Sequence, residues 1–74
     1  MKSETSTQIH LRVNGDPRHF ESTLSVAELL GQLDLAAARV AVMVNGEVAP
    51  RETHENRSLH DGDEVEVISM VGGG

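Results

Sequence analysis

The chain has 74 residues, enough for one small domain, and its 38% apolar residues and seven glycines are typical of a globular protein. Six basic against twelve acidic side chains leave a net charge of −6, which argues against nucleic acid or an anionic membrane as the partner. The absence of cysteine excludes a disulfide framework, a thiolate metal site and a cysteine nucleophile, and no apolar run approaches the ~20 residues of a membrane span.

The first seven residues are polar and contain no apolar stretch of the kind found in a secretory signal. We therefore expect residues 1–7 to be a flexible leader of a cytoplasmic protein. We expect a single domain over residues 8–71 and a flexible glycine tail over residues 72–74.

The first predicted element is a strand with one buried face, because Ile9, Leu11 and Val13 alternate with polar residues. The letters NGDP at residues 14–17 predict a turn, since glycine accepts positive φ and proline cannot continue a central strand. Residues 18–21 are then a short return strand that completes a hairpin, with Phe20, the only aromatic residue, turned inward.

A helix over residues 25–34 is the clearest local prediction. Ser25 and Glu28 have the spacing of a capping box, and the leucines on either side of the cap have the spacing of a hydrophobic staple. One face of this helix is apolar, formed by Val26, Leu29, Leu30 and Leu33.

The second half of the chain predicts further strands. Val40, Val42 and Val44 share one face of a strand, with Ala41 and Met43 on the other. Asn45-Gly46 is a hairpin turn, and Val48 continues as a brief strand. Residues 50–58 are predicted to be irregular, with at most one turn of helix.

The last part of the chain predicts an inward-facing leucine, a turn and a final strand. Leu59 should point inward, residues 61–63 should form a turn, and residues 64–71 should form a strand with Val65 and Val67 buried. This order of elements predicts an α+β fold, with a mixed sheet of four to five strands packed on one helix.

The chain ends in Val71-Gly72-Gly73-Gly74, and this tail is the candidate functional segment. A run without side chains can enter a narrow channel through backbone contacts alone. Its terminal carboxylate has no neighbouring Cβ to hinder attack, which suits a group that is activated and substituted in a partner's active site.

Three sequence segments together resemble the ThiS family of sulfur carriers, within the ubiquitin-type β-grasp proteins. They are the letters VNGEVAPR at residues 44–51, DGD at residues 61–63 and VGGG at residues 71–74. The resemblance covers about residues 8–74 and implies a β-grasp fold.

The resemblance also implies a chemistry in which this chain is a co-substrate and has no catalytic residue, metal or bound cofactor of its own. A ThiF-like adenylyltransferase, using ATP and magnesium, would activate the carboxylate of Gly74. Sulfur from a cysteine desulfurase would then form a thiocarboxylate. Gly72, Gly73 and Gly74 would enter the thiazole synthase ThiG, which would take the sulfur for thiamine biosynthesis.

A partner-docking patch is predicted next to the tail. If Val65 and Val67 face the core, alternation places Ile68 and Met70 on the opposite, exposed face, with Val71 beside them.

The remaining polar residues carry no chemistry in this interpretation. None of the four histidines is spaced for a helical metal site, so we expect ordinary surface or strand positions for His10, His19, His54 and His60. Asp61 and Asp63 are expected to bind backbone in their turn rather than act as an acid–base pair.

Other functions remain open at this stage. A MoaD-like small subunit of molybdopterin synthase would use the same terminal chemistry. A ubiquitin-like modifier, a carrier for another sulfur-requiring pathway and a β-grasp interaction module with an inert tail are the further alternatives.

Overall fold

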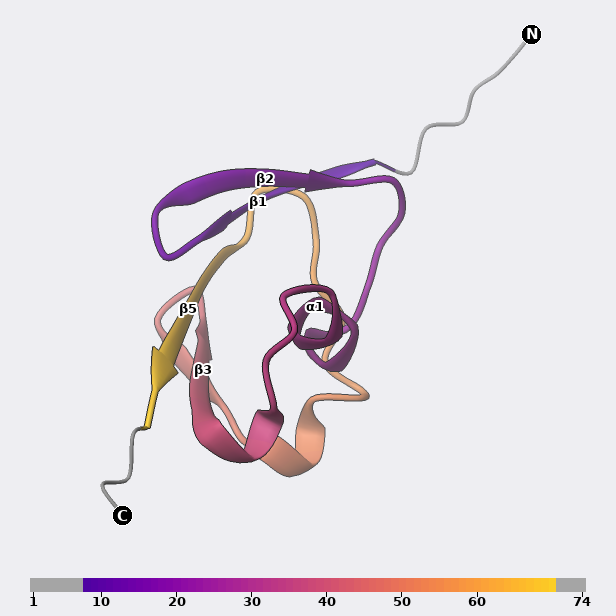
Figure 1. The fold of residues 1–74 in the computed structure, drawn as a ribbon. Coiled ribbons are helices and arrows are strands. Elements are labelled where there is room, and N and C mark those ends of the chain that lie inside the picture. Colours follow the sequence, from indigo (N-terminus) through magenta and orange to yellow (C-terminus); the bar gives the residue numbers. More distant parts are fainter. Residues whose placement is uncertain (1–7, 71–74) are drawn as a thin grey trace, which may run out of the picture.

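A computed structural model describes residues 8–70 of the chain, and the sheet that it contains curls around a single helix (Figure 1). The strands are β1 (Ile9–Val13), β2 (Asp16–Phe20), β3 (Val40–Val44), β4 (Glu47–Ala49) and β5 (Glu64–Ser69). The helix is α1 (Val26–Gln32), and two short 3-10 turns cover Ala37–Arg39 and Arg51–Thr53. None of these helices is long and apolar enough to span a membrane.

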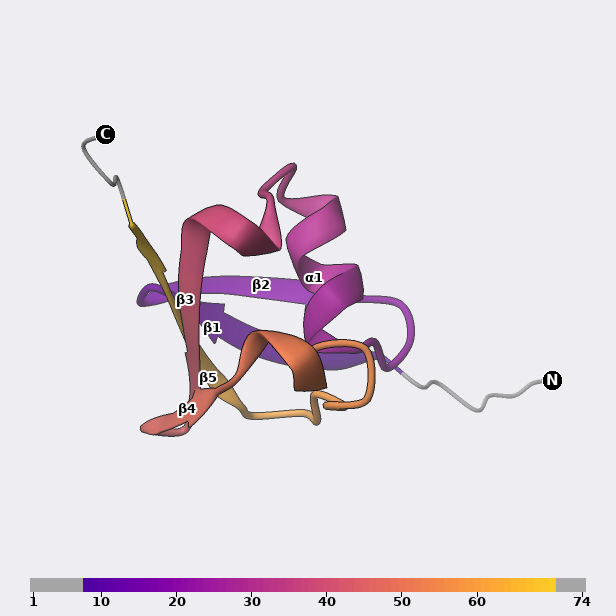
Figure 2. The same cartoon turned by 90° about the horizontal axis from the view of Figure 1, so that it is seen from below.

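The five strands form one mixed sheet in the order β2-β1-β5-β3-β4. Strand β5 lies in the centre, parallel to β1 and antiparallel to β3, while the two outer pairs are antiparallel hairpins. Helix α1 covers one face of the sheet, here called the inner face, and leaves the outer face open (Figure 2). The predicted α+β fold and its mixed sheet on one helix are confirmed.

The core lies between α1 and the inner face. Its members are apolar residues from every strand except β2, together with the helix and its flanking loops, and each is at most 7% exposed. They are Ile9, Leu11, Val13, Leu24, Val26, Leu29, Leu30, Val40, Val42, Val44, Ala49, Leu59 and Val65. The predicted inward positions are thus confirmed for the alternating residues of β1 and β3 and for Leu59, and Phe20 packs half-buried against this core.

The predicted capping box of α1 is present in full. The Ser25 hydroxyl accepts a hydrogen bond from the Glu28 N–H (3.1 Å), and the Glu28 carboxylate accepts one from the Ser25 N–H (2.8 Å). The helix ends at Gln32 rather than at the predicted residue 34, because Asp34 adopts a left-handed conformation with φ 61°. Its N–H donates to the Gly31 carbonyl (3.1 Å), which closes the helix terminus.

The first hairpin is tighter than predicted. Only Asn14 (φ 54°) and Gly15 (φ 85°) form the turn, so β2 begins at Asp16 and not at the predicted residue 18. Pro17 lies inside β2, which is possible because β2 is an edge strand and a missing N–H that faces solvent costs no ladder hydrogen bond.

Candidate functional site

The last described residues hold the base of the tail in a fixed position. Strand β5 is paired on both sides, and its pairing with β3 extends from Val65 to Ser69. The next residue, Met70, still donates its backbone N–H to the Arg39 carbonyl (2.8 Å). The predicted tail residues Val71, Gly72, Gly73 and Gly74 lie outside the described residues, so the predictions for them are taken up below as proposals.

The Asn14 side chain takes the place of β1 where that strand ends. Its Oδ1 accepts a hydrogen bond from the Val67 N–H (2.8 Å), and its Nδ2 donates to the Val67 carbonyl (3.2 Å). Strand β1 pairs with β5 only at Arg12 and Val13, so this amide continues the ladder one step toward the tail. The same residue therefore makes the hairpin turn and anchors β5.

Asn45, in the second Asn-Gly turn, secures the other end of β5. Its Oδ1 accepts from the Glu64 N–H (3.0 Å), and its Nδ2 donates to Asp63 Oδ1 (3.0 Å). The second oxygen of Asp63 accepts from the His60 N–H (2.8 Å). Two side chains that follow two different strands thus hold the central strand at its first residue, Glu64, and at Val67, the fourth of its six residues.

Asp61 and Asp63 bind backbone, as predicted. The Asp61 carboxylate accepts the His10 N–H (2.7 Å) and lies 3.2 Å from His10 Nδ1. The His10 backbone hydrogen bond, with the His10 side chain adding to it, holds the pKa of Asp61 below its usual value. Both carboxylates are therefore occupied with turn and strand contacts and are not arranged as an acid–base pair.

We predict that Asn14→Gly lowers the free energy of unfolding by about 1 to 3 kcal/mol, because it removes two hydrogen bonds to Val67 while tolerating the left-handed turn. Urea denaturation measures the loss, and hydrogen exchange should show the Val67 amide exchanging faster. Asn56→Gly is the matched control, since it deletes the same exposed side chain where the structure shows no side-chain hydrogen bond. Equal losses in the two variants would contradict the anchoring role.

The predicted exposure of Ile68 and Met70 is confirmed, at 51% and 54%. They belong to a wider apolar area on the outer face, since Ala41 pairs with Ile68 and Met43 pairs with Val48, which is 66% exposed. We call this area the outer patch and define it by five residues: Ala41, Met43, Val48, Ile68 and Met70. The members on β3 and β4 could not be assigned to this area from the sequence, because strand pairing between distant segments decides which residues lie beside Ile68.

One histidine prediction is wrong, because His54 is only 3% exposed. Its Nε2 lies 2.9 Å from the Ala49 carbonyl, and its own carbonyl accepts the Ala27 N–H at 3.0 Å. The loop after β4 therefore folds back on the sheet and on the start of α1, and the His54 side chain is buried by this fold. No group of three or more potential ligands in residues 8–70 could hold a metal ion.

Comparison with protein families supports a specific relationship. The model of the ThiS family matches residues 11–74, which includes all five strands except the start of β1 and extends through the terminal glycines. A solved structure described as thiamine biosynthesis protein (ThiS) from Geobacter metallireducens superposes with a TM-score of 0.77 at 42% identity. The match covers 89% of this chain and 100% of that one.

Curated relatives fall into two groups by length. The sulfur carrier protein ThiS of Thermus thermophilus is 36% identical over 62 residues, which cover 84% of this chain and 95% of the relative. A thiazole synthase of Paramagnetospirillum magneticum is 36% identical over 64 residues, 86% of this chain. The chain spans only 20% of that synthase, so the synthase contains a similar segment within a much longer protein.

Proposed function

The chain belongs to the ThiS family, and from this premise we propose that it is a sulfur carrier of thiamine biosynthesis that acts through the carboxylate of Gly74. Two of its relatives are named sulfur carrier protein ThiS, and the family match reaches the last glycine. In this role the chain is a co-substrate, and catalysis resides in its partner enzymes.

The observation that carries the proposal is the placement of β5. This strand is the centre of the sheet, is paired on both sides and is held by asparagine side chains at Glu64 and at Val67. A tail that continues from such a strand begins at a fixed point and in a fixed direction. A partner that docks on the domain can therefore meet the terminal carboxylate at a defined distance, which lowers the entropic cost of the reaction.

The proposed chemistry has two stages. First, an oxygen of the Gly74 carboxylate attacks the α-phosphate of ATP in a ThiF-like adenylyltransferase, where magnesium assists and pyrophosphate leaves. Second, the outer sulfur of a partner's cysteine persulfide, which a cysteine desulfurase supplies, attacks the acyl carbon and AMP leaves; a thiol then cleaves the S–S bond of the resulting acyl disulfide, which releases the thiocarboxylate and oxidises the two thiols to a disulfide. The sulfur-transferring groups belong to the partners, since this chain has no cysteine. ATP and magnesium are used by the partner adenylyltransferase.

Thiazole synthase is the proposed acceptor of the sulfur. Relatives with that name contain a segment similar to this chain, at 36% and 37% identity. A carrier and the enzyme that it serves are expected to work next to each other, and joining the two in one polypeptide keeps their effective concentration high. We therefore propose that the glycine tail enters the active site of a separate ThiG partner.

The test is the intact mass of the protein after incubation with ATP, magnesium, a ThiF-like enzyme and a sulfur source. We expect a gain that matches the exchange of one oxygen for sulfur, and an adenylate when the sulfur source is left out. A competent enzyme that produces neither species would contradict the proposed function. Lysine-linked conjugates in place of the thiocarboxylate would favour a ubiquitin-like modifier.

The outer patch is the proposed docking surface for the adenylyltransferase. Met70→Glu should weaken binding about 30-fold, the equivalent of about 2 kcal/mol, because it places a charge in a contact that excludes water. Titration by calorimetry measures the affinity. Gln32→Glu adds the same charge at an exposed position on α1 and should leave binding unchanged. Wild-type affinity in Met70→Glu would remove the outer patch from the interface.

A further inference from the structure

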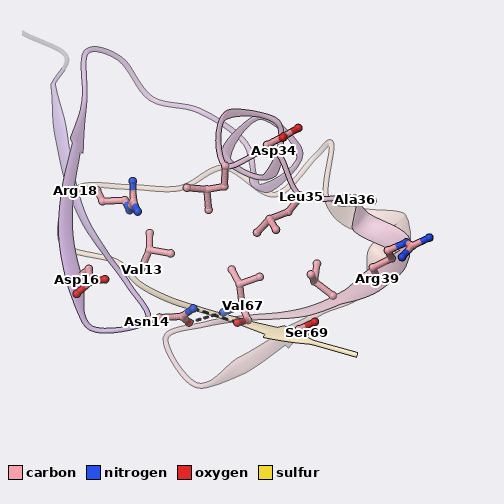
Figure 3. A pocket seen from close by; sticks show the side chains of 12 residues that line it. Val13, Asn14, Asp16, Arg18, Asp34, Leu35, Ala36, Arg39, Val67 and Ser69 are labelled. Atoms are coloured by element: carbon pink, nitrogen blue, oxygen red, sulfur yellow. Dashed lines mark hydrogen bonds between the residues drawn. The ribbon is translucent and has the colours of Figure 1, made fainter. Parts of the chain in front are cut away.

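A hollow lies on the inner face, next to the end of β5 (Figure 3). Its volume is about 600 Å³. Val13 of β1 and Val67 of β5 point into it from the sheet, and Leu35 points into it from the segment after α1 (Figure 3). We call it the inner cavity.

The inner cavity exists because α1 is too short to cover the whole inner face. The helix ends at Gln32, and the Leu35 N–H donates to the Leu30 carbonyl (2.9 Å), which folds the chain sharply back at the helix terminus. Beyond this point the segment after α1, and not the helix itself, faces the sheet across the cavity. Strand β2 presents polar residues there, since Asp16 and Arg18 pair with Val13 and Leu11 and share their face.

Two features of the inner cavity are unusual for a bare surface. Leu35 is 39% exposed and is the one exposed large apolar residue of residues 8–70 that lies outside the outer patch. Arg18 reaches into the cavity from β2, and its guanidinium makes no ion pair or hydrogen bond with any described residue. Of the three other charged side chains that line the cavity, those of Asp34 and Arg39 point away from it (Figure 3), whereas Asp16 lies two residues before Arg18 on the same face of β2.

The cavity and the outer patch lie on the two sides of the same strand end. Ser69, the last residue of β5, lines the inner cavity together with Val67, whereas Ile68 and Met70 are exposed on the other face. An enzyme that docks on the outer patch to receive the tail comes close to the end of β5, where the inner cavity opens on the other face.

We propose that the inner cavity is a second docking site for the adenylyltransferase and takes an apolar side chain of that enzyme that has a carboxylate next to it. The apolar side chain packs against Leu35, Val13 and Val67, and the carboxylate pairs with Arg18. This inference rests on the proposed function and adds a second contact to it. On a chain with net charge −6, a cation beside an apolar hollow gives an acidic group of the partner a favourable place to bind, which helps to fix the orientation of the complex.

Arg18→Glu and Leu35→Ala are the test variants, and titration of each against the ThiF-like enzyme is the measurement. Arg18→Glu should weaken binding about tenfold and Leu35→Ala about fivefold, while Arg18→Lys keeps the charge and most of the affinity. The loss in Arg18→Glu should shrink at high salt, because salt screens an exposed ion pair. Thermal unfolding of each variant establishes that the domain remains folded.

Arg12→Glu is the matched control. Arg12 lies in the same hairpin, is exposed and unpaired among residues 8–70, and alternates with the buried residues of β1, so that it faces the outer side. In the register of β1 and β5 its backbone lies opposite Glu64, at the start of β5 and at the far end of that strand from Met70. The reversal changes the net charge as Arg18→Glu does and should alter binding less than about twofold.

Two results would overturn this inference alone. Wild-type affinity in both test variants would show that the cavity is not in contact with the enzyme, and equal losses in Arg18→Glu and Arg12→Glu would show an effect of net charge only. Failure of the unmodified protein to be adenylated would overturn the proposed function, and this inference with it. Loss of binding confined to Arg18→Glu and Leu35→Ala, with adenylation of the unmodified protein intact, would support the inference.

Discussion

Removing Gly74, or replacing Gly73 with valine, is expected to abolish thiocarboxylate formation while the domain remains folded. Removal of Gly74 leaves a chemically similar carboxylate on Gly73, but the tail is shorter by about 3.5 Å. A reacting carboxylate that is misplaced by even 1 Å loses about a hundredfold in rate, so a whole residue should reduce the reaction below detection. Gly73→Val keeps the length and adds a branched side chain, which a channel shaped for glycine excludes.

Removal of Gly74 tests the length of the tail, and Gly73→Val tests its width. Intact mass spectrometry after the adenylation reaction measures both, and Gly74→Ala is an intermediate case that adds one methyl group beside the carboxylate. All three changes leave the core residues and the pairing of β5 with β3 as they are, so we expect thermal unfolding curves that match that of the unmodified protein. Full thiocarboxylate formation in the shortened chain would contradict a fixed distance between the docked domain and the active site.

The local patterns of the sequence predicted much of the structure. Alternation in β1 and β3, the Asn-Gly turns and the capping box at Ser25 each depend on residues close together in the chain, and all are present. The exposure of Ile68 and Met70 followed from the same alternation in β5. These features can be predicted from the sequence because hydrogen bonds between neighbouring residues and the alternation of side chains along a strand determine them.

The features that were missed depend on contacts between distant segments. Asn14 bonds to Val67, which lies 53 positions away, and no local pattern shows that β1 ends one step before this point. The burial of His54 likewise requires that its loop fold back on Ala49 and α1. Predicting the inner cavity would have required the correct end of α1. The helix ends two residues earlier than the sequence predicts, because Asp34 adopts a left-handed conformation.

Leu59→Ala is expected to lower the free energy of unfolding by about 2 to 5 kcal/mol. Leu59 is fully buried, and a truncated side chain there leaves a cavity between α1 and the sheet. A domain of 74 residues has a total stability of only about 4 to 11 kcal/mol, so the loss is a large share of the whole. The melting temperature should fall by about 10 °C or more.

Leu35→Ala is the matched control for this change, because it deletes the same atoms at a position that is 39% exposed. We expect it to cost less than about 1 kcal/mol, since water already reaches much of the side chain. A small loss at Leu59 would mean that the segment between β4 and β5 is not packed against the core. That result would also weaken the argument for a fixed tail, because Leu59 and the Asp61–Asp63 turn bring the chain into the start of β5. A large loss at Leu59 and a small one at Leu35 would instead separate the residue that holds the domain together from the residue that remains available to a partner.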